Sequence, residues 1–258
     1  MKTIGVIPAR YGSSRFPGKP LVKILGKPMI QWVYKHASAI DSFDKVVIAT
    51  DDSRISETAE GFGAEVIMTP ADCPSPTERL FLVSQTVDAD FFVMINGDEP
   101  TLSPDIISKC IPDDLRSSEI YVRNLMTECS NPTDVIDTTN IKVVTNKLGD
   151  CMYMSRSPIP FPKGAPVSRY MKFVGVTGFT RSALQFYHDT PIGEVERAED
   201  VDELRFVENG KRVEFVEVTV NSLSVDSPKD IAVVEDILSA MLVKTRRDSL
   251  SIKAFFSR

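Results

Sequence analysis

The feature of this sequence that most restricts its possible folds is a series of uninterrupted apolar runs separated by helical segments. The four runs span residues 3–8, 45–50, 65–68 and 91–96, and the helical segments span 29–40, 53–62 and 77–87. In the first helical segment Ile30, Val33 and Ala37 recur at the spacing of one helix face. Strands that are apolar on both sides are buried on both faces, which is typical of a parallel sheet covered by helices. We therefore expect an α/β fold with a mostly parallel sheet and flanking helices.

The pattern changes after about residue 115, where the strand candidates become shorter. These candidates are residues 120–126, 141–145, 150–154, 173–179 and 212–220, and the proline-rich segment 158–162 interrupts them. Residues 230–242 follow as an amphipathic helix. We expect one domain over residues 1–242 with an inserted, more irregular lobe at about 116–220. The basic tail, residues 243–258, is expected to be a solvated end, or else to contact a partner subunit.

Charge and cysteine content exclude several classes of protein. Thirty Lys and Arg against 36 Asp and Glu give a net charge of −6, which argues against a general nucleic-acid binder. No apolar stretch approaches the roughly 20 residues of a membrane span, and Pro8 interrupts the start too early for a secretory signal. The two histidines and four widely spaced cysteines offer no zinc spacing. We therefore expect free thiols, a cytoplasmic location and no membrane partner.

A loop rich in cations follows the first strand. The strand ends at Pro8 and Ala9, and Arg10, Arg15 and Lys19 then share one loop with Gly12, Ser13, Ser14 and Gly18. Small residues let backbone N–H groups approach phosphates, and the three cations can offset the charge of a polyphosphate. The loop is neither a Walker A sequence nor a G-x-G-x-x-G sequence. A solvated surface loop with incidental charges is the weaker alternative.

Two acidic motifs lie at the boundaries of other elements. Asp98, in Asn96-Gly97-Asp98-Glu99-Pro100, follows the most apolar strand. A carboxylate in such a place can bind Mg²⁺, which prefers one or two carboxylates together with phosphate oxygens. Asp226 precedes the start of the last helix. Taken alone, Asp226 is better explained as a helix cap, with Pro228 at the first helical position.

Taken together these motifs resemble the CMP-Kdo synthetases, the 3-deoxy-manno-octulosonate cytidylyltransferases. The matching segments, in order from residue 3 to about 242, are 7–21, 26–34, Ala49-Thr50-Asp51-Asp52, Thr77-Glu78-Arg79-Leu80, Gly97-Asp98-Glu99-Pro100, 155–160 and Val225-Asp226-Ser227-Pro228. The resemblance implies a glycosyltransferase-A-like fold, usually dimeric. It also implies an enzyme that couples CTP to an acidic sugar and releases pyrophosphate.

The resemblance also implies roles for particular residues. Pro8, Ala9, Arg10, Arg15, Lys19 and Asp98 would bind the nucleotide, with the three cations on the phosphates. Ser75, Thr77 and Arg79 would face the nucleoside. Asp98 and Asp226 would hold Mg²⁺ and, with Lys19, carry the catalysis. The lobe would supply acceptor and dimer contacts, and its acceptor-binding residues would be Arg156, Phe173, Thr177, Asp202 and Glu203.

The sequence departs from the family pattern mainly in the acceptor half. Pro76 replaces a glycine beside the nucleotide and requires a backbone φ near −65°. Phe173 and Thr177 replace a histidine and a tyrosine that contact the sugar, and Val201-Asp202-Glu203-Leu204-Arg205 replaces Leu-Glu-Gln-Leu-Arg. Phenylalanine cannot hydrogen-bond a sugar. We therefore expect Kdo to be a poor acceptor, unless other residues of the lobe restore the missing contacts and Kdo is the substrate after all.

The sequence thus predicts a cytidylyltransferase that activates Kdo or a related 3-deoxy-ulosonic acid. Three alternatives remain open at this point: the same chemistry on another acidic sugar or a phosphonate, a glycosyltransferase of the same fold, and a nucleotide-binding module without activity. Because both Asp98 and Asp226 are present, the inactive module is the least favoured. Release of pyrophosphate from CTP separates the cytidylyltransferases from the other two classes.

Overall fold

The computed structural model describes residues 1–12, 16–115, 119–166, 169–220 and 223–255. Its strands are β1 (Thr3–Ala9), β2 (Lys23–Ile24), β3 (Lys27–Pro28), β4 (Lys45–Thr50), β5 (Glu65–Met68), β6 (Phe91–Ile95), β7 (Val122–Glu128), β8 (Lys142–Thr145), β9 (Cys151–Ser155), β10 (Met171–Thr180) and β11 (Val213–Glu217). Its helices are α1 (Met29–Ala37), α2 (Ser53–Gly61), α3 (Pro76–Thr86), α4 (Pro104–Ser108), α5 (Pro132–Ile136), α6 (Arg181–Asp189), α7 (Glu194–Glu199), α8 (Leu204–Glu208) and α9 (Asp230–Phe255), with a short 3₁₀ helix, η1 (Lys19–Leu21).

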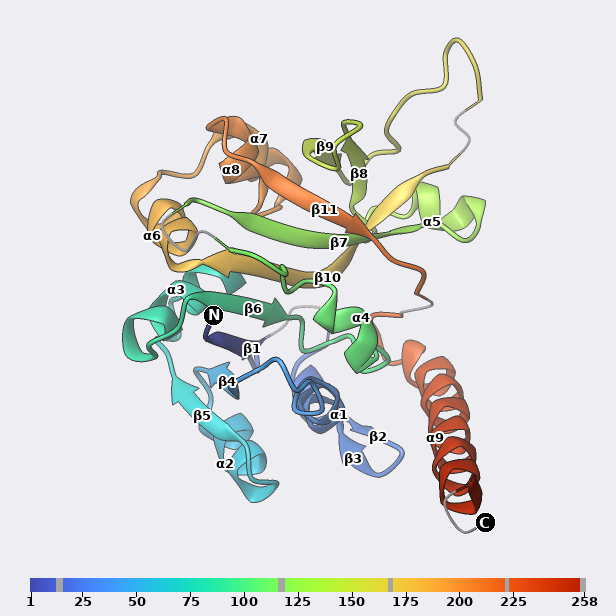
Figure 1. Cartoon of the computed structure of the whole chain (residues 1–258). Coiled ribbons are helices and arrows are strands. Elements are labelled where there is room, and N and C mark those ends of the chain that lie inside the picture. The colour runs from blue at the N-terminus through green and yellow to red at the C-terminus, as the bar shows by residue number, and fades with distance from the viewer. Residues whose placement is uncertain (13–15, 116–118, 167–168, 221–222, 256–258) are drawn as a thin grey trace.

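The main sheet has the strand order β11-β7-β10-β6-β1-β4-β5 (Figure 1). Strands β6, β1, β4 and β5 are parallel neighbours, and β11 is parallel to β7. Strand β10 is antiparallel to both of its neighbours, β6 and β7. The expected α/β fold with a mostly parallel sheet is therefore confirmed.

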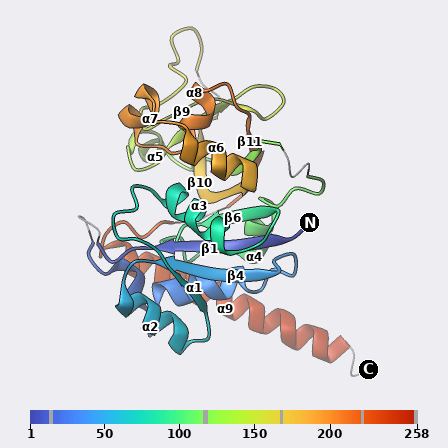
Figure 2. The same ribbon diagram turned by 90° about the vertical axis from the view of Figure 1, so that its left-hand side faces the viewer.

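Both faces of the central strands are buried, which explains why their sequences are apolar without interruption. In β1, Ile4 and Val6 belong to one hydrophobic core and Ile7 and Ala9 to the other. Helices α3, α6 and α8 supply the first core, and α1, α2 and α4 supply the second. Figure 2 shows the lobe helices and the α1–α2 side at opposite ends of the molecule. This burial holds the strand ends in fixed positions relative to one another.

The predicted lobe shares the main sheet with the rest of the chain. Strands β7, β10 and β11 lie within the sheet, and β8 joins its edge through β10 and pairs with β9. The lobe helices α5, α7 and α8 span only five or six residues each, too few for a clear apolar period.

The C-terminal helix is longer than the sequence pattern indicates. Helix α9 continues through the predicted boundary at 242/243 to Phe255, and its far end leaves the body of the molecule (Figures 1 and 2). No helix in the described part of the chain combines the length and apolarity that crossing a membrane requires.

Candidate active site

Four parallel strands end at the same edge of the sheet. The residues that directly follow β1, β4, β5 and β6 are Arg10, Asp51, Thr69 and Asn96. Ligands of open α/β sheets bind at this edge. Gly97 allows β1 and β6 to approach closely here, because a Cβ atom at position 97 would lie 3.2 Å from the carbonyl oxygen of Pro8. The edge therefore brings polar side chains from four separate segments together.

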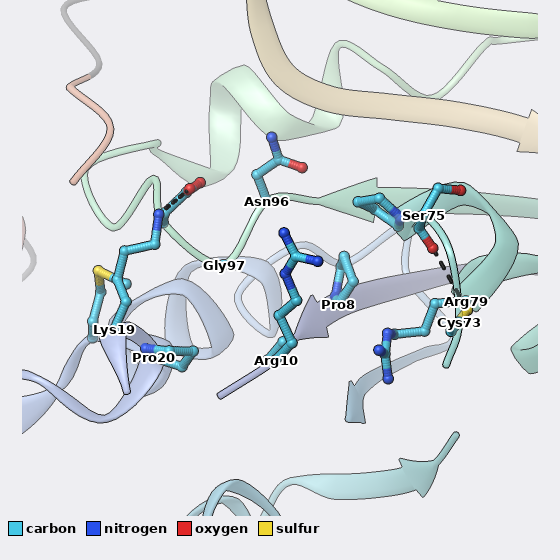
Figure 3. A pocket seen from close by; sticks show the side chains of 13 residues that line it. Pro8, Arg10, Lys19, Pro20, Cys73, Ser75, Arg79, Asn96 and Gly97 are labelled. Atoms are coloured by element: carbon cyan, nitrogen blue, oxygen red, sulfur yellow. Dashed lines mark hydrogen bonds and ion pairs between the residues drawn. The ribbon is translucent and has the colours of Figure 1, made fainter. Parts of the chain in front are cut away.

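A cavity of about 240 Å³ opens at this edge (Figure 3). It is lined by all the predicted nucleotide-binding residues except two, namely Pro8, Ala9, Arg10, Lys19, Ser75, Arg79 and Asp98. Of the other two, Thr77 is fully buried and its neighbours Ser75, Pro76 and Arg79 line the cavity. Arg15 lies outside the described residues. Asn96 and Cys73 also line the cavity, and no sequence pattern pointed to either residue.

The loop after β1 holds Lys19 at the cavity wall. Gly18 has a left-handed backbone with φ +71°, and its N–H donates to the carbonyl oxygen of Tyr11 at 2.9 Å. This turn leads directly into η1, where the Lys19 ammonium donates to the Asp98 carboxylate at 2.6 Å. Arg10 is exposed and lies between Lys19 and Arg79 in Figure 3. Two cations are thus available at this side of the cavity.

The structure brings Asp226 next to Asp98. The backbone N–H of Val225 donates to the carbonyl oxygen of Asp98 at 2.9 Å, although the two residues are far apart in sequence. The Asp226 carboxylate accepts a hydrogen bond from the hydroxyl of Ser224 at 2.8 Å. Mg²⁺ takes one or two carboxylates from a protein and its remaining ligands from phosphate and water, and each of these two adjacent segments carries one carboxylate. The described residues contain no group of three or more His, Cys, Asp or Glu side chains that could hold a metal ion.

The capping contacts before α9 are made by Asp230. Its carboxylate accepts from the backbone N–H groups of Asp226 and Ser227 at 3.0 and 2.7 Å, and from the Ser227 hydroxyl at 2.9 Å. In these contacts the capping carboxylate belongs to Asp230, and Ser227 is one of its partners.

The start of α3 explains the proline that departs from the family pattern. Ser75 is the N-cap, and its hydroxyl accepts from the N–H of Glu78 at 3.1 Å. Pro76 occupies the first helical turn, where a missing N–H has no helical partner to lose. The lobe also contacts this turn, because the Tyr187 and Ser75 hydroxyls lie 3.0 Å apart and Asp202 accepts from the N–H of Thr77 at 3.2 Å.

The guanidinium of Arg156 is bound to backbone oxygens. It donates to the carbonyl oxygens of Glu199, Thr138 and Asp200 at 2.7, 3.1 and 2.9 Å. Arg156 therefore ties β9 to two other segments of the lobe, and it does not line the cavity. Sequence alone could not reveal these contacts, because each uses a backbone oxygen that any residue would supply.

Thr177 and Glu203 form a buried polar pair. The Thr177 hydroxyl donates to the Glu203 carboxylate at 2.9 Å, and the Asn124 side chain contacts the same hydroxyl. Burial, together with the nearby negative charge of Asp202, raises the pKa of Glu203 to about 7. Phe173 is half-buried and packs against the core. The predicted acceptor-binding residues Phe173, Thr177, Asp202 and Glu203 do not line this cavity.

Glu203→Gln is expected to stabilise the protein more at pH 8 than at pH 5. A carboxyl whose folded pKa lies above its unfolded pKa stabilises the fold at low pH, and that stability is lost as the pH rises through about 7. Removing the charge should raise the free energy of unfolding by about 3 kcal/mol at pH 8. Urea unfolding at both pH values measures this difference. An effect that is equal at pH 5 and pH 8 would contradict it.

Comparison with known proteins agrees with this site. The sequence model of the cytidylyltransferase family matches residues 4–213. The chain is 38% identical to the 3-deoxy-manno-octulosonate cytidylyltransferase of Solibacter usitatus, covering 94% of this chain and 97% of the relative. It is equally similar, at 38%, to the 8-amino-3,8-dideoxy-manno-octulosonate cytidylyltransferase of a Shewanella species, covering 93% of this chain and 100% of that protein.

A solved structure gives the same result. The structure of CMP:2-keto-3-deoxy-manno-octonic acid synthetase complexed with CTP superposes with a TM-score of 0.87 at 37% identity, covering 93% of this chain and 100% of that one. The match extends over both the nucleotide half and the lobe. The chain is therefore a nucleotidyltransferase of the cytidylyltransferase family and belongs to its CMP-Kdo synthetases.

Proposed function

We propose that this protein couples CTP to 3-deoxy-manno-octulosonate (Kdo) or a close 3-deoxy-ulosonic acid, giving the CMP-sugar and pyrophosphate. The observation that carries the proposal is the cavity at the carboxyl edge of the sheet. There Lys19, which binds Asp98, lies at one side, Ser75 and Arg79 lie at the other, and Arg10 lies between them. The cavity thus offers separate regions for a polyphosphate and for a nucleoside.

The reaction requires alignment and charge neutralisation more than covalent help from the protein. The sugar hydroxyl attacks the α-phosphorus of CTP, a new P–O bond forms, and the bond between the α-phosphorus and the bridging oxygen breaks. Pyrophosphate leaves with that oxygen, and the hydroxyl proton passes to solvent or to a nearby base. Arg10 and Lys19 can stabilise the charge that develops on the phosphate oxygens.

We propose Asp98 and Asp226 as the carboxylates that hold Mg²⁺. When bound, the metal would stabilise negative charge on the phosphates and orient them. The Lys19 ammonium contacts Asp98 at 2.6 Å, so a metal on Asp98 would compete with this ion pair. Phosphate oxygens are the alternative partners for Lys19, which lies on the same cavity wall as Arg10. Lys19 is therefore placed either to neutralise Asp98 or to bind the phosphates of CTP.

CTP is expected to be used at least about tenfold better than ATP or GTP. A pocket that hydrogen-bonds a pyrimidine leaves buried polar groups unmet when a purine occupies it, at about 1–3 kcal/mol for each group. Pyrophosphate release with Kdo as acceptor measures the three values of kcat/KM. No pyrophosphate from CTP with any 3-deoxy-ulosonic acid would contradict the proposed function, and equal values for ATP and CTP would contradict the pyrimidine preference.

Two observations favour a second acceptor. The relatives named for the 8-amino acid are as similar to this chain as those named for Kdo. Phe173 and Thr177 also stand where the family pattern has two hydrogen-bonding side chains. We therefore include 8-amino-3,8-dideoxy-manno-octulosonate as the second candidate acceptor.

We also propose a cytoplasmic homodimer. The lobe exposes large apolar side chains, with Ile136 69%, Leu148 78% and Phe161 81% exposed, and such residues are common at subunit interfaces. The four cysteines are free, which suits a reducing compartment. A monomer in sedimentation velocity, or recovery of the protein outside the cytoplasmic fraction, would contradict these two proposals.

A further inference from the structure

Asp51 lies at the active edge of the sheet but has no role in the mechanism above. It belongs to Ala49-Thr50-Asp51-Asp52, a motif singled out by resemblance without an assigned function. Asp51 directly follows β4, and Thr69 directly follows the parallel neighbour β5. The N–H of Thr69 donates to the carbonyl oxygen of Thr50 at 2.8 Å, which continues the ladder beyond the strands. The two side chains therefore start from adjacent positions.

Both side chains bind the guanidinium of Arg79. Its Nη2 lies 3.2 Å from the Asp51 carboxylate, and its Nη1 donates to the Thr69 hydroxyl. The side chains of Arg79 and Asp51 are only 5% and 15% exposed. Arg79 nevertheless lines the cavity, on the side opposite Lys19 in Figure 3.

A guanidinium this deeply buried needs a compensating charge and a fixed direction. An uncompensated buried charge is strongly unfavourable, whereas a paired one is held in a defined geometry. Arginine has five N–H donors in a rigid plane. The contacts with Asp51 and Thr69 use one donor on each terminal nitrogen, and they fix the plane in which the remaining donors lie.

The neighbouring Asp52 provides a natural comparison. Its carboxylate caps α2 by accepting from the N–H of Arg54 at 3.0 Å, and it also binds the Arg54 side chain at 2.9 and 2.6 Å. Asp52 is bound to its own helix, whereas Asp51 binds a residue of the cavity wall. Two adjacent acids thus have different partners.

We propose that Asp51 is a positioning residue for recognition of the nucleotide base. Through its ion pair it holds the Arg79 guanidinium in the orientation in which the remaining N–H groups meet the carbonyl oxygen of a pyrimidine. Thr69 is the second anchor of the same group. This inference rests on the proposed use of CTP, and it assigns a function to Asp51 that is independent of the phosphates.

The test separates the base half of the ligand from the phosphate half. CMP and inorganic tripolyphosphate serve as competitive inhibitors of CTP in the intact protein. Asp51→Asn is expected to raise KM for CTP and Ki for CMP by about tenfold or more, the scale of a hydrogen bond to a charged group. The value of kcat and the Ki of tripolyphosphate should change less than threefold.

Two further variants make the result decisive. Thr69→Val keeps the ion pair and should raise the Ki of CMP by a smaller factor, so it tests the proposal even if Asp51→Asn fails to fold. Asp52→Asn is the matched control and should leave both Ki values within twofold. Unchanged CMP inhibition in Asp51→Asn and Thr69→Val would overturn the proposal, as would an equal loss of CMP and tripolyphosphate binding. Wild-type protein that does not use CTP would instead contradict the proposed function itself.

Discussion

Asp98→Asn and Asp226→Asn are each expected to lower the turnover of CTP at least about a hundredfold while the protein remains folded. Loss of one element that stabilises charge in the transition state typically has this size. Asparagine has nearly the shape of aspartate, so the change removes the negative charge with little effect on packing. Turnover by pyrophosphate release and thermal unfolding of each variant measure the two parts of this prediction.

Both variant proteins are expected to keep their stability, for separate reasons. The Lys19–Asp98 pair has side-chain exposures of 16% and 27%, and ion pairs with access to solvent contribute only about 0–1 kcal/mol. Asp226 is half-buried, and its carboxylate accepts from Ser224. Neither carboxylate supports a helix end through the contacts described above.

Asp230→Asn is the control for the Asp226 variant. The Asp230 carboxylate accepts hydrogen bonds from the backbone N–H groups before α9. Its replacement should therefore lower the melting temperature and leave turnover nearly unchanged. The opposite outcome at Asp226, normal turnover with a reduced melting temperature, would show that this carboxylate acts in the turn and not on the metal. Normal turnover in Asp98→Asn would likewise contradict its proposed role.

The nucleotide half of the site was predictable from the sequence because its residues directly follow apolar strands. Once a parallel sheet is expected, the strand ends must meet at one edge, and Arg10 and Asp98 are placed together without further information. The position of Asp226 beside Asp98 was implied by resemblance only. The backbone hydrogen bond from Val225 to Asp98 joins two segments that no local sequence pattern places close together.

The lobe was less predictable, for physical reasons that differ from residue to residue. Its short helices do not repeat an apolar face often enough to be recognised. Arg156 binds carbonyl oxygens, and the sequence does not show which backbone groups a cation will meet. Burial of Glu203 depends on the packing of α8 against β10, which also brings Thr177 to its carboxylate. Outside the lobe, the place of Pro76 in the first turn of α3 explains how the chain accommodates this proline.

In the acceptor half, neither of the two residues that depart from the family pattern offers a hydrogen bond to a sugar. Thr177 is completely buried and donates to Glu203, so it does not restore the contact that a tyrosine at this position would make. Phe173 is half-buried and has no hydrogen-bonding group. A tyrosine at position 177 would displace this buried pair, whereas a side chain at position 173 is only partly covered. Position 173 is therefore the one at which a family side chain can be restored experimentally.

Phe173→His is expected to raise kcat/KM for Kdo at least tenfold. One regained hydrogen bond to the substrate corresponds to about 1.4 kcal/mol, which is a factor of about ten. The backbone at this position is held by a hydrogen bond from the Phe173 N–H to the carbonyl oxygen of Ile141 at 2.9 Å, so the exchange of side chains leaves the strand in place. Phe173→Leu is the matched control, because it changes the apolar side chain without adding a hydrogen-bonding group, and it should not raise kcat/KM.

The same assay on wild-type protein, with Kdo and the 8-amino acid in parallel, tests the basis of this expectation. If Phe173 removes a contact to Kdo, kcat/KM for Kdo should fall below about 10⁴ M⁻¹s⁻¹, the lower end of the ordinary range. An acid that differs from Kdo where Phe173 lies should then be the better substrate, since an apolar wall does not penalise the loss of a hydroxyl. A wild-type kcat/KM for Kdo of about 10⁴ M⁻¹s⁻¹ or above, together with no gain in Phe173→His, would show that Phe173 only packs against the core and that Kdo binds through other residues of the lobe.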